Sequence, residues 1–274
     1  MRSQDIPQGH DGGLAHDLTA LDKMIARRNA LGWIGGAGVL ALLPGASGVL
    51  AAGQAPERCL SAPGETAGPF PANGTNHAPG PTSNALAARG IVRSDIRPSF
   101  IGSTRVAEGM PLDLMLTLVD AASCAPLAGY AVYIWQSDAD GLYSLYSAPQ
   151  ESWLRGVQRT DAAGRVRFTS IVPGCYAGRY PHLHVQVFGG IDAALTGREA
   201  LLTSQLIIPA EMAHAAFADA ERYPGSAESF VRFSLARDYV FADNSAAELA
   251  AMTLAVTARG RGRFGAQGRI ALAA

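Results

Sequence analysis

The feature that most constrains the fold is a succession of short strand-like segments with turn residues between them. In residues 112–119 four leucines alternate with other residues, which places the leucines on one face of an extended strand. Residues 131–136 are rich in β-branched and aromatic side chains, as strands prefer. The close spacing of such segments predicts an all-β chain folded as a single β-sandwich domain. Further strands are predicted at 165–171, 182–188, 201–208 and, as a last edge strand, 270–272, whereas 246–257 is compatible with a helix or a strand.

The composition agrees with a folded domain and narrows the range of partners. Hydrophobic residues make up 48% of the 274-residue chain and charged residues 16%, so there is enough apolar material for a core. Lys and Arg number 22 and Asp and Glu number 23, which is a nearly neutral balance. This balance argues against a phosphate backbone or an anionic membrane surface as the partner, so no nucleic acid is expected.

The N-terminal segment differs from the rest of the chain and predicts export. Its first part is polar and ends in Arg27 and Arg28, residues 29–56 carry no charge, and V-L-A-A at 49–52 offers a small-residue cleavage site after the apolar stretch. A basic region, a short apolar region and a small-residue cleavage site together indicate a secretory signal. The paired arginines make this signal similar to the twin-arginine type.

An uncleaved membrane anchor is the alternative interpretation of this segment, because about 20 apolar residues suffice to cross a bilayer. Six glycines and Pro44 between Gly32 and Ala52 make a poor span, so no stable span is expected after processing. We therefore expect a twin-arginine-type signal segment at 1–52 and one domain at 53–274, exported to the periplasm or outside the cell.

Three cysteines follow the predicted signal. An oxidising compartment permits a disulfide bond, and three thiols allow one bridge and leave one cysteine free. Cys59 and Cys124 both lie in proline-flanked loop sequence, so we expect these two to pair. Cys175 is expected to remain a small buried thiol.

Two histidines separated by one residue form the most informative pair in the chain. On a strand His182 and His184 point to the same face and can reach one metal ion, while Leu183 faces the core. Tyr176 precedes them across a Pro-Gly turn, and Tyr143 lies in a turn after the second predicted strand. An isolated His-x-His pair is more often two hydrogen-bonded histidines, and single tyrosines more often hold loops. The combination of the four is what points to a metal.

The residue types select among metals. Two imidazoles with two phenolates suit hard, trivalent iron, whereas zinc prefers cysteine, histidine and carboxylate ligands. Two phenolates would also offset two of the three positive charges of iron(III). A ferric cofactor is therefore the hypothesis that these side chains favour.

Short motifs follow one another in a specific order along the domain. They are Y-I-W-Q at 133–136, G-L-Y at 141–143, L-R-G-V-Q at 154–158, P-G-C-Y at 173–176 and R-Y-P-H-L-H at 179–184, with T-A-G-P-F at 66–70 before them and T-S-Q-L at 203–206 after them. In this order they resemble the intradiol ring-cleavage dioxygenases, which include the catechol 1,2- and protocatechuate 3,4-dioxygenases and their exported relatives. The resemblance covers about residues 59–208.

This resemblance implies a fold, a cofactor and roles for individual residues. The iron would lie between the sheets of a β-sandwich, at one edge. Its substrates would be a catechol-type aromatic diol and O2, and both oxygen atoms would enter a muconate-type product. Tyr176 would leave the iron when the diol binds and take up a proton, while Arg179 and Gln205 would line the substrate pocket. The residues that would hold Fe(III) are Tyr143, Tyr176, His182 and His184.

The sequence departs from the cytoplasmic relatives in two places. Their usual Arg-Pro-Ala-His is here Arg-Tyr-Pro-His, with Tyr180 and Pro181 in the middle, so the pocket wall beside the iron is expected to differ. No long helical dimerisation segment precedes the sandwich, which leaves the formation of a homodimer open. If the substrate is a carboxylated catechol, Arg155 and Arg159 are the candidate cations for its carboxylate.

Two other classes of protein share part of the pattern. A non-catalytic exported binding module, similar to transthyretin or to carboxypeptidase regulatory domains, has comparable turns at 129–176 but needs neither the His-x-His pair nor Tyr143. An inactive, iron-binding relative attached to carbohydrate is the third hypothesis. The presence of all four ligands in register favours the enzyme, and the colour of tyrosinate-bound ferric iron would distinguish the classes.

Overall fold

The computed structural model describes residues 59–176, 178–260 and 262–273. The predicted signal segment lies outside these residues, so the segment and the domain boundary at residue 53 remain predictions. Within the described part of the chain the strands form two four-stranded sheets, connected mainly by loops and short helices. The predicted all-β class with two sheets is confirmed.

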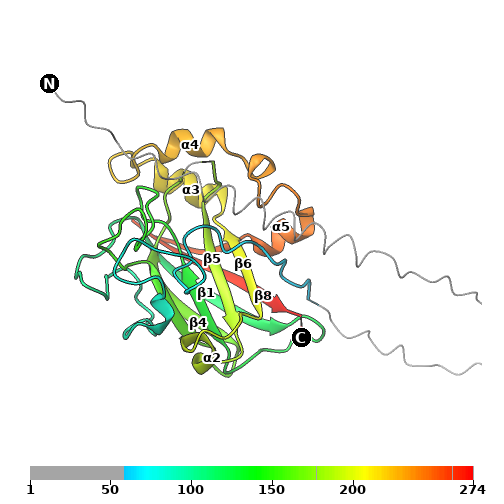
Figure 1. Cartoon of the computed structure of the whole chain (residues 1–274). Coiled ribbons are helices and arrows are strands. Elements are labelled where there is room, and N and C mark those ends of the chain that lie inside the picture. Colours follow the sequence, from blue (N-terminus) through cyan, green and yellow to red (C-terminus); the bar gives the residue numbers. More distant parts are fainter. Residues whose placement is uncertain (1–58, 177, 261, 274) are drawn as a thin grey trace, which may run out of the picture. The chain divides into compact units, whose positions relative to one another are not determined.

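Each sheet is assembled from strands that are distant in sequence (Figure 1). The strands of the first sheet are β1 (Pro111–Asp120), β4 (Arg165–Ile171), β7 (Ala255–Gly260) and β8 (Arg263–Leu272), and those of the second are β2 (Ala131–Trp135), β3 (Arg155–Arg159), β5 (His182–Phe188) and β6 (Leu202–Ile207). The strand orders are β4-β1-β8-β7 and β3-β2-β5-β6. Neighbouring strands run antiparallel except β1 and β8, which are parallel.

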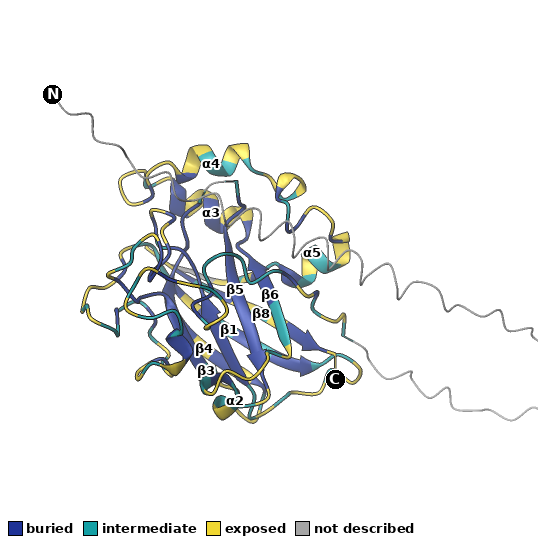
Figure 2. Cartoon of the chain, in the orientation of Figure 1, coloured by how far each residue is buried: buried dark blue, intermediate teal, exposed yellow. Residues whose placement is uncertain are grey.

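The main hydrophobic core lies between the two sheets. The four alternating leucines of β1 are at most 2% exposed, as the period of two predicted. They share one cluster with Ile134 of β2 and with Leu183 and Val185 of β5. Burial of each such side chain stabilises the fold by about 1.5–3 kcal/mol, so the alternation fixes which face of β1 points inward. Figure 2 shows the buried strands at the centre of the fold.

The outer face of the β3-β2-β5-β6 sheet is also covered. Every residue of β2 and β5 is buried, on both faces of the sheet. A second cluster lies on this outer face, where Tyr133 and Trp135 of β2 pack with residues of the N-terminal loops, of the short helix η1 (Ala85–Ala87) and of α2 (Ile191–Leu195). The N-terminal described segment crosses in front of β5 and β6 (Figure 1). This covering creates a second buried layer, in which the candidate site lies.

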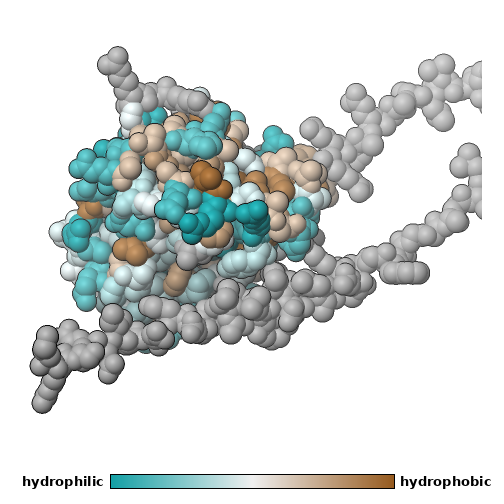
Figure 3. Space-filling view, turned by 90° about the horizontal axis from the view of Figure 1, so that it is seen from above, coloured by the Kyte–Doolittle hydropathy of each residue, from teal (hydrophilic) through white to brown (hydrophobic). Residues whose placement is uncertain are grey.

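Four further helical segments follow β6: α3 (Ala210–Phe217), α4 (Ser226–Arg232), η2 (Leu235–Arg237) and α5 (Ala246–Met252). The stretch 246–257 contains both predicted structures: Ser245 and Glu248 form a capping box that starts α5, and β7 begins at Ala255. Within the described residues no helix combines the length and hydrophobicity that crossing a membrane requires. The surface seen from the α3 and α4 end shows hydrophobic residues as separate spots among hydrophilic ones (Figure 3).

Two strand predictions need correction. The last strand is not a three-residue edge at 270–272 but the ten-residue β8, which lies between β1 and β7. The first half of β8 alternates between buried and exposed positions, but its glycines and arginines do not show this alternation as a hydrophobic pattern in the sequence. The strand β3 was not predicted, because Gly156 interrupts its pattern. A Cβ at Gly156 would collide with Ile96, so the loop before β1 could not pack there against a larger residue.

The cysteine prediction is confirmed. Cys59 and Cys124 form a disulfide bond across 65 residues, with their Cα atoms 5.4 Å apart, and Cys175 is a buried free thiol. Burial raises the pKa of Cys175 to about 12, so this thiol stays protonated. The bond fastens the start of the described chain to the turn after β1.

Candidate metal centre

One row of side chains crosses the β3-β2-β5-β6 sheet at the level of the candidate site. Arg155, Trp135, His184 and Gln205 are direct partners on successive strands, so their side chains stand on one face of the sheet. His182, two residues before His184 on β5, points to the same face. Local strand geometry therefore assembles both histidines and one of the predicted pocket residues.

This face is the outer face of the sheet, which corrects the expected position of the site. The residues that alternate with the histidines on β5 belong to the core between the sheets, so His182 and His184 point away from that core. Tyr143 belongs to the second cluster, under the covering loops. The expectation of a site between the two sheets is therefore wrong. The site lies between one sheet and the loops on its outer face.

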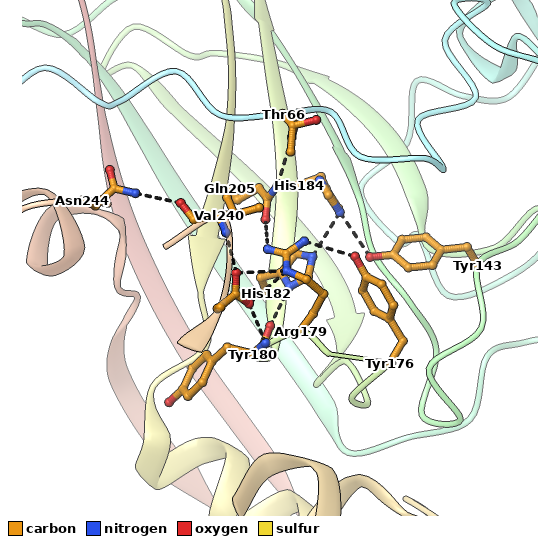
Figure 4. A network of polar contacts seen from close by, with 11 residues as sticks. Thr66, Tyr143, Tyr176, Arg179, Tyr180, His182, His184, Gln205, Val240 and Asn244 are labelled. Atoms are coloured by element: carbon orange, nitrogen blue, oxygen red, sulfur yellow. Dashed lines mark hydrogen bonds and ion pairs between the residues drawn. The ribbon is translucent and has the colours of Figure 1, made fainter. Parts of the chain in front are cut away.

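The polar atoms of the predicted ligands converge here (Figure 4). The Nε2 atoms of His182 and His184 are 3.1 Å apart, and Nε2 of His184 is 3.2 Å from Tyr143 Oη. The ring centroid of Tyr176 is 5.3 Å from that of Tyr143 and 5.6 Å from that of His182. The structure thus brings together all four residues that the sequence singled out, from β5 and two separate loops.

A close approach of two loops brings the tyrosines together. Gly141 has a φ of +78°, and a Cβ at this position would collide with the Cys175 carbonyl. Only glycine therefore lets the loop before Tyr143 lie against the loop that carries Tyr176. The backbone N–H of Tyr143 donates to Ser147 Oγ at 2.7 Å, which fixes the residue from the other side.

The hydrogen bonds of His182 determine which of its nitrogens faces the site. Its Nδ1 lies 2.6 Å from the carbonyl oxygen of Tyr180. A carbonyl only accepts hydrogen bonds, so Nδ1 carries the proton and donates. Burial, reinforced by the positive charge of Arg179, holds the pKa of His182 well below its ordinary value, so the ring is neutral. Its Nε2 therefore presents a lone pair to the site.

His184 is held mainly by packing. Its ring stacks on Trp135 at a centroid distance of 4.8 Å and an angle of 4°. On another side Gly68, with a φ of +66°, approaches so closely that a Cβ there would lie 3.1 Å from His184 Cε1. Among the described residues Nδ1 of His184 has no hydrogen-bond partner, and burial lowers the pKa of this ring as well. The structure thus fixes the plane of the ring and leaves its Nε2 in the site.

The donor set fits a hard, highly charged cation. Two neutral imidazoles and two phenols face one another, and the described residues contain no group of three or more His, Cys, Asp or Glu that could hold a metal ion. Burial, followed by the charge of Tyr176, raises the pKa of Tyr143 well above its ordinary value. A buried phenol of this kind becomes anionic when a cation binds it, because a metal reverses the local electrostatics. Zinc would find none of its preferred carboxylate or thiolate ligands here.

Arg179 connects this donor set to a network of hydrogen bonds. Its Nη1 donates to Tyr176 Oη at 3.2 Å and its Nη2 donates to Gln205 Oε1 at 2.7 Å. The Nε2 of Gln205 in turn donates to the carbonyl of Thr66 at 2.9 Å. The structure therefore places the two predicted pocket residues in direct contact with each other and with Tyr176.

Asp238 is the residue at this site that the sequence did not reveal. It is fully buried and accepts from Arg179 Nε at 3.1 and 2.9 Å, as well as from the backbone N–H groups of Tyr180 and Val240. The only available signal was indirect: a buried arginine usually needs a carboxylate partner. Because the two residues are 59 positions apart in the sequence, no spacing rule identifies which carboxylate it is.

The structure changes two expectations about the pocket. The ring of Tyr180 points away from the site and packs with Phe230 and Val240, so position 180 contributes its carbonyl to the site rather than a wall (Figure 4). Arg155 is fully buried and donates to Ser144, to Tyr133 and to a backbone carbonyl, whereas Arg159 is exposed four residues further along β3. The guanidinium of Arg155 is thus already bonded to acceptors of the protein itself.

The fold and the donor set define the class of a two-sheet protein with a histidine- and tyrosine-lined candidate metal centre, and comparisons with known proteins show what it is similar to. A family model described as Dioxygenase matches residues 83–203, which include all four proposed ligands. No curated protein matches the chain by sequence.

Two solved structures share the fold. An intradiol ring-cleavage dioxygenase from Tetranychus urticae is 20% identical, with a TM-score of 0.55, over 78% of this chain and 95% of that one. A second dioxygenase structure is 21% identical, with a TM-score of 0.56, over the same shares of both chains. With the family match over residues 83–203, these findings support the resemblance seen in the sequence: part of the chain matches a dioxygenase family model, and its fold is similar to that of an intradiol ring-cleavage dioxygenase.

Proposed function

We propose that this chain is a non-haem iron(III)-dependent intradiol dioxygenase, which opens catechol-type aromatic rings with O2 to muconate-type products. One observation carries the proposal. The Nε2 atoms of two neutral histidines and the Oη of Tyr143 lie together at separations of 3.1 and 3.2 Å, in a buried position. A binding module of similar fold would need none of these donors.

In this proposal Tyr143, Tyr176, His182 and His184 hold the iron. Held by these residues, ferric iron would supply the Lewis-acid chemistry that activates a deprotonated diol for reaction with dioxygen. The protein would orient these reactants and keep the ligand geometry fixed, as proteins around cofactors generally do. The stacked Trp135 and the carbonyl of Tyr180 hold the two imidazoles for this purpose.

Tyr176 is the residue that we propose to move a proton. Its Oη is the ligand atom that Arg179 contacts, through Nη1 at 3.2 Å. As a phenolate, this atom can accept a proton from a diol hydroxyl when the diol takes its place. Arg179, whose charge is permanent, would then face the electron-rich ring, and Gln205 keeps the guanidinium in position.

We also propose that the protein is exported in a folded state by its twin-arginine-type signal. The paired arginines support this proposal, and the disulfide between Cys59 and Cys124 suits an oxidising compartment. Mass spectrometry of protein from the periplasm and from the culture medium should find a chain that begins near residue 53. Full-length protein confined to the cytoplasm would refute export.

The central experiment combines metal analysis, visible spectroscopy and oxygen uptake on the purified protein. We expect ferric iron, a red to purple colour, and oxygen uptake with catechols that yields a muconate-type diacid without an external reductant. Stoichiometric zinc or copper in place of iron would refute the ligand assignment. A semialdehyde product, formed by cleavage beside the diol, would refute the reaction.

A matched pair of tyrosine variants makes the colour test specific. Tyr143→Phe keeps the ring but removes the donor oxygen, so it should shift or bleach the visible absorption. Tyr146→Phe removes an oxygen that instead bonds to the backbone N–H of Ala72 and to Asn76, so it should leave the absorption unchanged. Equal spectra for the two variants would exclude Tyr143 as a ligand.

A further inference from the structure

Asp238 accepts hydrogen bonds from a side chain and from two backbone N–H groups beside the site. Both of its oxygens contact Arg179 Nε, at 3.1 and 2.9 Å, and they also accept from Tyr180 N at 2.7 Å and from Val240 N at 2.9 Å. Its side chain is 0% exposed and that of Arg179 is 1% exposed. Two buried charges of opposite sign with all these hydrogen bonds form a rigid pair, since neither can exchange its partner for water.

This pair determines where the rest of the guanidinium points. With Nε held by Asp238 and Nη2 held by Gln205 Oε1 at 2.7 Å, the planar group is fixed along two of its edges. The remaining nitrogen, Nη1, is the one that reaches Tyr176 Oη. Among the described residues Asp238 makes no hydrogen bond to Tyr176 or to the other proposed ligands, so Arg179 is the side chain that links it to the site.

The segment around Asp238 completes the enclosure of the guanidinium. Tyr239 and Phe241 lie over Arg179, with their ring centroids 4.9 and 5.5 Å from its Cζ. Phe241 also approaches His182, at 6.1 Å between ring centroids. This segment follows η2 and lies outside residues 83–203, the range that the family model matches. A part of the chain beyond that range therefore holds the arginine of the site.

We propose that Asp238 is a positioning residue for ring cleavage, which holds Arg179 Nη1 on the Tyr176 oxygen and so keeps the guanidinium beside the reacting ring. This inference rests on the proposed function for its kinetic consequence, whereas the geometric part stands without it. A purely structural role, as a tether of the segment that follows η2, is the alternative. The two differ in whether the effect of Asp238 depends on Arg179.

The geometric part is tested in the full chain, metal-free or loaded with gallium(III), which is diamagnetic. In 15N NMR spectra, assigned with Arg179→Lys, the Arg179 Nε–H should exchange with solvent at least about tenfold more slowly than that of Arg105, which is 82% exposed. Asp238→Asn should abolish this protection. Exchange of the Arg179 Nε–H in the wild type as fast as that of Arg105 would overturn the proposal, whether or not any variant folds.

The kinetic part is tested with the iron-loaded protein on catechol. Asp238→Asn should retain iron and lower kcat about tenfold or more, with KM changed less than about threefold, because a misplaced Arg179 affects the reaction rather than diol binding. In an Arg179→Met background the same change should lower kcat by less than about threefold, because the group that it positions is already absent. Asp238→Glu should restore part of the rate.

Asn244→Ala is the matched control for tethering. Its Nδ2 holds the same segment through Val240 O and Glu65 Oε1, each at 3.0 Å, without touching Arg179. This variant should lower thermal stability and leave kcat within about twofold. An equal loss from Asp238→Asn with and without Arg179 would show tethering alone and overturn the proposal. An iron-free, inactive wild type would refute the proposed function, while the NMR result would still decide the geometry.

Discussion

Replacing Asp138 with asparagine should raise the free energy of unfolding near neutral pH and leave it unchanged in acid. Asp138 begins the turn that leads to Tyr143, and its Oδ1 accepts from the backbone N–H groups of Asp140 at 3.0 Å and Leu142 at 2.8 Å. Burial, only partly offset by these hydrogen bonds, raises the pKa of Asp138 from 3.8 to about 6. Asparagine offers the same acceptor oxygen without the charge.

The sign of the effect follows from proton binding. Between pH 3.8 and about 6 the folded chain binds more protons at Asp138 than the unfolded chain does. The stability contributed by this group is therefore fully present below pH 3.8 and is lost as the pH rises through about 6. The full upward shift of the Asp138 pKa corresponds to about 3 kcal/mol in the free energy of unfolding. Because the side chain is partly exposed, we expect a gain of about 1–3 kcal/mol for Asp138→Asn at about pH 8.

Urea unfolding followed by circular dichroism at several pH values measures this gain directly. The difference between variant and wild type should be near zero at about pH 3.5 and should reach its full value above about pH 7. Asp140→Asn, an exposed change of the same charge in the same turn, should alter the free energy of unfolding by no more than about 0.5 kcal/mol. A gain of equal size at all pH values, or no gain at high pH, would refute the argument.

Three further changes test the site and the fold. His184→Ala should lose bound iron, because it removes one of the four proposed donors, whereas His214→Ala, which changes an exposed histidine on α3, should retain the iron. Metal analysis of both variants tests this. Full retention of iron in His184→Ala would mean that the wrong histidine pair was chosen. Cys124→Ser should lower the free energy of unfolding by about 4 kcal/mol, because the lost bond closes a loop of 65 residues, and an unchanged urea midpoint would contradict this. Arg179→Ala should lower kcat by about 10²-fold. It should also destabilise the fold by about 3 kcal/mol, because Asp238 stays buried without its cation, so equal thermal stability of Arg179→Ala and wild type would contradict the buried pair.

Most strands and the cluster of candidate ligands could be predicted because both depend on short-range rules. Alternation with a period of two identified β1, and the same geometry placed His182 and His184 on one face of β5. The order of motifs identified the two tyrosines, and the sparse cysteines identified the disulfide. Each of these inferences needed only neighbouring residues or a recognisable order of motifs.

The sequence could not tell which face of the sheet carries the site. Alternation reveals a direction only when one face of a strand is polar and exposed, and every residue of β5 is buried. The N-terminal loops cover the outer face as thoroughly as the first sheet covers the inner one. Contacts such as that of Gly68 with His184 place the site on the outer face of the sheet, and they form between residues more than 100 positions apart in the sequence. The position of β8 between β1 and β7 likewise depends on a partner, β1, that is distant in the sequence.

The environment of Arg179 shows most directly what only the tertiary structure decides. The sequence marks this arginine by its place three residues before a histidine, and that place carries no information about its charge partner. Desolvation makes a buried guanidinium require a carboxylate, but any acidic residue of the chain could satisfy the requirement. Folding brings Asp238 across 59 residues to that position and leaves one guanidinium nitrogen directed at Tyr176. The amino-acid sequence thus determines which groups are candidates to bind a metal ion, because residue chemistry and strand parity are local properties. The orientation of the groups around them depends on burial, which exists only in the folded chain.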